Sequence, residues 1–452
     1  MRRFFNSIII LLLLSGFISA QGEDEVFVVT GDSLSGKILD GQNVRVVNGN
    51  VHMTQGNVLI TCDKAIQFLR SNSAELTGNV VITQDSLRIL TSKGYYEANR
   101  KTAYSFAGLT LYNGKMKLVA DTGYYYANRK KAFFRGEVHL QDTTNQIFSD
   151  KLTYFKNENK AVAVGRVKVM DTASVVYSDS LIHFRDAKIT YGFRNIRIVN
   201  EEQSAVVTGD YLEDNGQTNT TIVSGNAFFT QIDTAENGTI DTLYISSKKM
   251  TAVADSTERI IAEDSVKILR GIFSGRNSKS VYYRNEEKIF IQRQKNEKEP
   301  PVMWYEYTQL SGDSIYIYLK KNELQQIDIH QNAFILSKNE DYLYRFDQIS
   351  GDRIKMFFEN RKLNRTEVKG NVLSIYYMFE KEEPNGLLKS SARDAKIIFE
   401  NNTIVDVRLY GSPISEYHPE NLIVNNEQSF TLPKFVIYGS RPEKEKLLKN
   451  RK

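Results

Sequence analysis

The chain has 452 residues, a formal net charge of +5 and 41% hydrophobic residues. This mild positive charge would favour contact with anionic head groups or phosphates, but it is too small to indicate a nucleic-acid-binding protein. Cys62 is the single cysteine, which excludes a disulfide within the chain. Strand pairing and burial must therefore stabilise the fold.

The first residues predict an export signal, residues 1–20. Met1-Arg2-Arg3 precedes an apolar run at residues 8–14, and small residues follow up to Ala20. Because the run is shorter than the roughly 20 residues that a membrane-spanning helix needs, we expect cleavage after Ala20. The alternative is an uncleaved anchor helix.

The next segment, from about residue 41 to residue 200, repeats one strand pattern six times with a step of 29 residues. So strict a step indicates one structural unit copied in register. Apolar residues recur at every second position, and a period of two fits a strand but no helix. The first apolar column consists of Val51, Met53, Val80, Ile82, Leu109, Leu111, Val138, Leu140, Val167, Val169, Ile196 and Ile198.

A second apolar column has the same step, which predicts two strands and their turns in each unit; it consists of Ile60, Ile89, Leu118, Ile147 and Val176. Turn residues also repeat and tolerate left-handed backbone; they are Asn99, Asn128, Asn157 and Asp186.

A third column is mostly acidic and consists of Asp63, Ser92, Asp121, Asp150 and Asp179. Calcium is one interpretation, but this ion takes six to eight oxygens and each unit offers one carboxylate. We expect turn capping instead, with no metal site and no cofactor.

Residues 31–37 invite two enzyme interpretations. They resemble a phosphate-binding loop, but Ile38 stands where a Ser or Thr should hold magnesium. Ser33, in Gly31-Asp32-Ser33, resembles the nucleophile of a GDSL-type hydrolase, but none of the five histidines stands three residues after an aspartate. The triplet recurs at residues 312–314, as expected for a turn before a strand. We therefore predict a protein without catalytic activity.

Beyond residue 200 the step loosens, but Gly225-Asn226 and Gly370-Asn371 repeat the earlier Gly78-Asn79. The sequence thus predicts a repeat block at residues 21–205, a second and more divergent β block at 206–425, and a charged tail at 426–452. We expect the tail to be disordered or weakly helical from Arg441. Trp304 should be a packed anchor where the array restarts.

The stretch 46–65, with Asn48-Gly49-Asn50-Val51, is followed by the related stretch 74–82, and Ser149-Asp150-Lys151-Leu152-Thr153-Tyr154 repeats a similar rung. Together they resemble the OstA-like family, which includes the lipopolysaccharide-transport protein LptA and the soluble N-terminal domain of LptD. The resemblance covers about residues 41–200 well and 224–410 loosely. It implies an all-β fold, namely an elongated, folded-over antiparallel sheet (β-jellyroll or β-taco) of tandem repeats in two consecutive blocks.

The resemblance also implies a function. The protein would be a periplasmic lipid-binding conduit that shields lipopolysaccharide acyl chains between the inner and outer membranes and contributes to outer-membrane assembly. The seventeen residues of the two apolar columns would line its groove. Partners would be lipopolysaccharide or a related lipid, LptC-like and LptD-like bridge proteins joined through edge strands, and further copies of the chain stacked head to tail. The same columns equally fit a dry sheet core, so a structural or adhesive repeat protein of the cell envelope is the alternative.

Overall fold

The computed structural model describes residues 28–449 except 56–57, 85, 127–128, 144, 235–237, 239, 296, 322, 340, 343, 382 and 402. The expected export signal at residues 1–20 lies outside the described residues. Among the helices that are described, none has the length and apolar character needed to cross a bilayer. The chain divides into two compact units. The N-terminal unit holds the described residues of Arg3–Glu201 together with Gly209–Thr221, and the C-terminal unit holds Glu202–Thr208 together with those of Ile222–Lys452.

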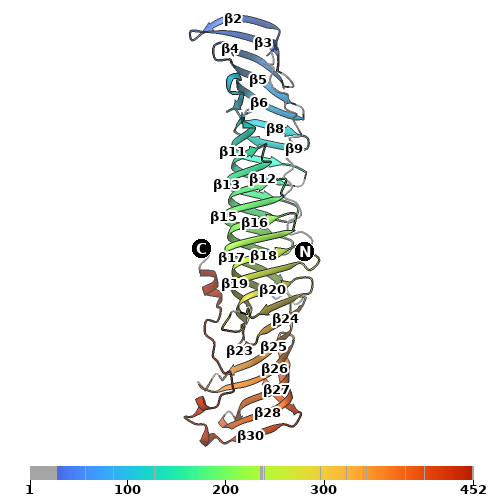
Figure 1. The fold of residues 1–452 in the computed structure, drawn as a ribbon, viewed down its shortest axis with the longest axis vertical. Coiled ribbons are helices and arrows are strands. Elements are labelled where there is room, and N and C mark those ends of the chain that lie inside the picture. Colours follow the sequence, from blue (N-terminus) through green and yellow to red (C-terminus); the bar gives the residue numbers. More distant parts are fainter. Residues whose placement is uncertain are drawn as a thin grey trace. The chain divides into compact units, whose positions relative to one another are not determined.

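The N-terminal unit is an antiparallel meander in which most strands pair with the next strand of the chain (Figure 1). Its strands are β1 (Val28–Thr30), β2 (Ser33–Leu39), β3 (Gln42–Gln55), β4 (Val58–Phe68), β5 (Ser73–Gln84), β6 (Leu87–Glu97), β7 (Thr102–Ser105), β8 (Leu109–Asn113), β9 (Met116–Ala120), β10 (Thr122–Tyr126), β11 (Lys131–Gln141), β12 (Gln146–Phe155), β13 (Lys160–Met170), β14 (Val175–Phe184) and β15 (Ile189–Asn200), with the 3-10 turn η1 (Ala98–Arg100). The all-β, antiparallel fold class is confirmed. Strands β16 (Ala205–Asn215) and β17 (Thr220–Thr234) carry residues of both units.

The strands of this unit bend at β-bulges near their middles. The pairing of β5 with β6 shifts register between Thr77 and Val80, where Gly78 has φ +75° and Asn79 has φ +43°. A bulge bends a strand and re-aims its side chains. Leu76 and Val80, on either side of this corner, therefore belong to the same buried cluster. The sheet folds over on itself, and its two halves form facing walls.

The aspartate column stabilises these corners. Asn79 Nδ2 donates to Asp63 Oδ2 at 2.9 Å, and a Cβ on Gly78 would lie 2.3 Å from the same oxygen. Asp179 accepts from Asn195 in the same way at 3.0 Å. Among the described residues no group of three or more His, Cys, Asp or Glu is placed to hold a metal ion. Each aspartate thus holds the corner of the neighbouring strand.

The left-handed turn residues lie two positions beyond the predicted ones. Lys101 and Lys188 have φ of +45° and +52°, whereas Asn99 lies within η1. Asn99 and Asp186 instead accept hydrogen bonds from the preceding turns, for example from Asn159 Nδ2 to Asp186 Oδ2 at 3.0 Å. The side chains of Asn99 and Asp186 thus join one turn to the next. The left-handed conformation is adopted two residues later, where the chain reverses direction.

The C-terminal unit continues the meander with longer strands (Figure 1). Its elements are β18 (Ile240–Val253), β19 (Arg259–Arg270), β20 (Phe273–Tyr283), β21 (Lys288–Gln292), β22 (Val302–Tyr305), β23 (Thr308–Ser311), β24 (Ser314–Lys320), β25 (Glu323–Lys338), β26 (Phe346–Glu359), β27 (Lys362–Glu380), β28 (Glu383–Glu400), β29 (Thr403–Tyr410), β30 (Ile414–His418), the 3-10 turns η3 (Glu420–Leu422) and η4 (Glu427–Ser429), and the helix α1 (Lys444–Lys449). Trp304 is 7% exposed within β22, consistent with the packed anchor expected at that point.

Residues 419–441 form an ordered segment, the strap, on the outer face of one wall. Ile423 and Leu432 are 0% and 4% exposed and pack with Phe334 and other apolar residues of β25, β27 and β28. Gln348 binds the strap backbone twice, accepting from the N–H of Leu432 at 2.8 Å and donating to the carbonyl of Phe430 at 3.0 Å.

The tail from Arg441, expected to be disordered or weakly helical, binds to the wall and then forms a short helix. Arg441 donates to the carbonyl of Glu306 at 2.6 Å and to Ser274 Oγ at 3.2 Å, and residues 444–449 form the short helix α1. Charged residues dominate the composition of the tail. Composition alone therefore did not indicate that Arg441 binds to the wall.

Candidate functional site

Strand register joins the two predicted apolar columns into one row. Met53 pairs with Ile60, and Ile60 pairs with Ile82. The row continues across the strands through Ile89, Leu111, Leu118, Leu140, Ile147, Val169, Val176 and Ile198. A period in the sequence thus becomes an unbroken apolar surface inside the folded-over sheet.

All seventeen residues predicted to line a groove face this interior. Fifteen of them are 0–8% exposed, while Ile82 and Ile89 are partly buried. From Val138 to Ile198 the predicted residues are only 1–2% exposed. Contact of these side chains with a lipid stays a prediction.

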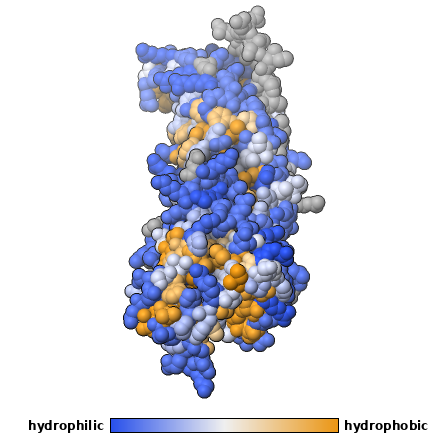
Figure 2. All heavy atoms as spheres, turned by 60° about the horizontal axis from the view of Figure 1, so that its bottom comes forward, coloured by the Kyte–Doolittle hydropathy of each residue, from blue (hydrophilic) through white to orange (hydrophobic). Residues whose placement is uncertain are grey.

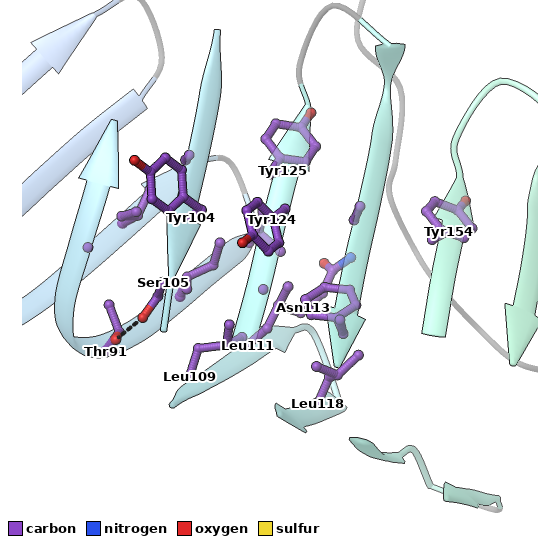
Figure 3. A pocket seen from close by; sticks show the side chains of 18 of the residues that line it. Thr91, Tyr104, Ser105, Leu109, Leu111, Asn113, Leu118, Tyr124, Tyr125 and Tyr154 are labelled. Carbon is purple, nitrogen blue, oxygen red and sulfur yellow. Dashed lines mark hydrogen bonds between the residues drawn. The ribbon is translucent and has the colours of Figure 1, made fainter. Parts of the chain in front are cut away.

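Space opens between the walls over β3–β12. Two adjoining cavities of about 290 Å³ and about 90 Å³ share Ile82, Leu87, Ile89, Ala103 and Tyr125 in their linings. Figure 3 shows the smaller cavity, with leucines from β8 and β9 on one side and tyrosines from β10 and β12 on the other. Ile82 and Ile89, the more exposed members of the row, line both cavities.

Polar side chains form the rim of the groove. One wall contributes Gln55, Gln84 and Asn113, and the other contributes Tyr96 and Tyr125. The Tyr96 hydroxyl donates to Gln55 Oε1 at 2.9 Å, which joins the two walls. Burial raises the pKa of Tyr125, so its hydroxyl stays neutral. The groove therefore has an apolar floor and a polar rim of amides and phenols, with Lys101 as a cationic side chain in the lining of the larger cavity.

The rim continues the 29-residue step and was missed in the sequence. Tyr96, Tyr125, Tyr154 and His183 are spaced by 29 residues, as are Gln55, Gln84 and Asn113. The tyrosines pair with alanines on the neighbouring strands, so a large side chain lies beside a small one. Burial lowers the pKa of His183 to about 4, which leaves its imidazole neutral. Extending the period to polar residues would have found this rim.

Gly31-Asp32-Ser33 has a structural role as a corner. The N–H of Asp32 donates to the carbonyl of Gly49 at 2.9 Å, and its carboxylate accepts from Asn50 Nδ2 at 3.0 Å. Asp313 repeats both contacts with the carbonyl of Gln331 and with Asn332 Nδ2. Residues 36–37 lie inside β2 and do not form a loop before a helix, so the phosphate-loop geometry is not formed. Catalytic activity remains untested.

Comparison with known proteins identifies a family similarity in one part of the chain. Residues 23–105 match the family model described as OstA-like protein, which confirms the predicted resemblance over that segment. No curated protein matches the chain. Among solved structures, the chain is similar to LptH from Pseudomonas aeruginosa, described as the LptA homologous periplasmic component of the conserved lipopolysaccharide transport device. That similarity has 16% identity and a TM-score of 0.13, and it covers 39% of this chain and 96% of LptH.

Proposed function

We propose that the protein is a lipid-binding conduit that shields lipopolysaccharide acyl chains in the periplasm on their way from the inner to the outer membrane. The observation that supports it is the continuous apolar row under a polar rim, open over β3–β12. Each methylene removed from water contributes roughly 0.8 kcal/mol, so such a row would stabilise an acyl chain along its length. The OstA-like match of residues 23–105 supports the same function.

Transport of a lipid with several chains requires the walls to move apart. The cavities of about 290 Å³ and about 90 Å³ are smaller than most ligand pockets, which range from about 300 to about 1,000 Å³. At the rim the walls are joined by the side-chain hydrogen bond between Tyr96 and Gln55. Such a contact opens without breaking strand pairing, so the groove can widen at low cost.

The partners in this proposal bind through edge strands. Among the described residues, β2 pairs with β3 and β29 pairs with β28, and the other edge of each strand has no partner strand. Unpaired edges accept further strands by β-augmentation. We infer that LptC-like and LptD-like proteins, or further copies of this chain, add to these edges in the periplasm after residues 1–20 are removed.

Photo-crosslinking tests the proposal directly. A photoreactive residue at Ile82, Leu111 or Leu140 should capture lipopolysaccharide in cells. A photoreactive residue at His139 should not capture it, because this side chain lies outside the groove. Its ring stacks there on Phe148, with 4.3 Å between the ring centroids. Equal labelling at all four positions, or none at any of them, would refute the conduit.

A structural spacer of the cell envelope is the second candidate, and the deep burial of the apolar row from Val138 to Ile198 favours it. A spacer would give no crosslink at Leu140 and would be dispensable for the outer-membrane barrier. If it were displayed on the cell surface, protease would reach it on whole cells. Neither function includes catalysis, so Ser33→Ala should leave either of them unchanged; loss of function in that variant would point to an enzyme.

A further inference from the structure

The C-terminal unit contains a groove of its own. A cavity of about 380 Å³ lies between its walls, with an apolar lining that includes Ile335, Ile349, Met356, Ile397 and Val407. This volume falls within the range of about 300 to about 1,000 Å³ that is typical of small-molecule sites.

One side of this groove carries a row of polar side chains that differs from the rim in the N-terminal unit. Register places Thr308 opposite Ser337 and Ser337 opposite Asp347 on three adjacent strands, and all three line the cavity. The hydroxyls of Thr308 and Ser337 are 2.8 Å apart. Tyr376 lines the same cavity and is 38% exposed. This groove therefore presents the carboxyl groups of Asp347 and Glu306, where the other presents amides, phenols and the cationic Lys101.

Asp347 has no cationic partner among the described residues. Its Oδ1 accepts from the backbone N–H of Tyr377 at 2.9 Å, and no Lys, Arg or His of the described chain forms an ion pair with it. Asp328, the 1% exposed acid of β25, is by contrast bound to Arg353 Nε at 2.8 Å. Burial among apolar groups raises the pKa of Asp347 to about 7. A carboxylate in such a place is unstable unless a positive charge or further donors reach it.

We propose that this groove binds a single-chain amphiphile whose head group carries a protonated amine. The tail lies on the apolar lining around Ile335 and Ile397, and the ammonium group donates to Asp347 and the neighbouring hydroxyls. A phosphate head group would place negative charge against the carboxylate and is disfavoured there. The two grooves then differ in the ligand charge that they accept.

Calorimetric titration of the full chain at about pH 8 tests this proposal with dodecylammonium and dodecyl phosphate, each below its micelle concentration, and with dodecanol below its solubility limit. The ammonium probe should bind at least tenfold tighter than the phosphate probe. Asp347→Asn should weaken binding of the ammonium probe roughly tenfold, the order expected for a hydrogen bond between charged groups, and leave dodecanol unchanged. Asp406→Asn is the matched control, because that exposed carboxylate pairs with Arg408.

Two filling variants locate the site. Ala395→Trp should abolish binding of the ammonium probe, because Ala395 lines this cavity, and Ser374→Phe should do the same if the first variant does not fold. Ala103→Trp, which fills the N-terminal groove, should leave it intact. Equal affinity for the three probes, or binding that is lost with Ala103→Trp, would overturn the proposal. Lipopolysaccharide crosslinking at Ile82 reports on the N-terminal groove separately, so failure of one proposal is distinguishable from failure of the other.

Discussion

At the scale of single residues, the corners determine the fold. Gly78 and Asn79 both have positive φ, which ordinary side chains adopt at a cost, and Asp63 fills the space that a Cβ on Gly78 would need. Gly370 and Asn371 repeat the arrangement with Asp352 in the other unit. The same corner, a Gly-Asn pair in left-handed conformation beside an aspartate, therefore occurs in both units.

Gly78→Ala should lower the free energy of unfolding by about 1–3 kcal/mol, because the new Cβ would lie 2.3 Å from Asp63 Oδ2 in a left-handed conformation. Gly36→Ala is the control, since a Cβ at that strand position meets nothing within 4 Å. Urea denaturation of both variants measures the difference. Equal stability of the two variants would contradict the role of the corner.

Asp347 makes a pH-dependent contribution to stability whose sign follows from its pKa. Burial raises that pKa from 3.8 to about 7, so between these values the folded protein retains a proton that the unfolded chain releases. Stability from this group is present in acid and is lost as the pH rises from about 4 to about 7. Asp347→Asn should therefore gain in melting temperature relative to the native protein over that range, with a constant difference above it. Thermal melts between about pH 4 and about pH 9 check this, and a difference that does not vary with pH would refute it.

At the scale of elements, the strap gives one wall of the C-terminal unit a core on both faces. Phe334 and Leu336 lie under the strap, whereas Ile335, between them in β25, lines the groove. Burial on both faces explains why β25 has four consecutive buried residues where β13 and β14 alternate. The strap therefore stabilises the wall that carries Asp347.

Ile423→Ala should destabilise the C-terminal unit by about 2–5 kcal/mol, because the side chain is 0% exposed in the cluster under the strap. Its neighbour Val424 is 49% exposed, so Val424→Ala should change stability little. Limited proteolysis should cut the strap of the first variant faster than that of the second. Equal cleavage rates would mean that the strap is not held by this cluster.

At the scale of the whole molecule, each compact unit has its own groove and its own unpaired edge strand. Ile38 in β2 is 75% exposed, and Val405 in β29 is 50% exposed. Figure 2, in which the end carrying β28 and β30 comes forward, shows hydrophobic surface gathered there. Unpaired strand edges that expose apolar side chains are sites where strands of another chain add.

Ile38→Lys and Val405→Lys should each reduce self-association of the mature protein, because a charged side chain on an edge opposes strand addition. Ile240→Lys is the control, since Ile240 is 69% exposed but lies in β18, which is not one of these edge strands. Sedimentation velocity over a range of concentrations measures the effect. Association that is unaffected by either edge variant would place the contact elsewhere.

The sequence by itself determined the repeated strands of residues 41–200 and the inward side of their apolar columns. A step of 29 residues and a period of two suffice for this, because a unit copied in register repeats its strands and side chains alternate along each strand. The seventeen predicted groove residues all face the interior for that reason. The antiparallel pairing and its register came from the tertiary structure.

Only the tertiary structure decided where the walls separate and which residues cover the outer face of a wall. It also decided which carboxylate has no cationic partner among the described residues. These features depend on side chains far apart in the sequence. Tyr96 bonds to Gln55 across the walls, and Leu432 bonds to Gln348 from the strap. A periodic sequence pattern predicts which positions are equivalent in successive units. Packing between the walls depends instead on side-chain volumes and charges, which differ from one unit to the next.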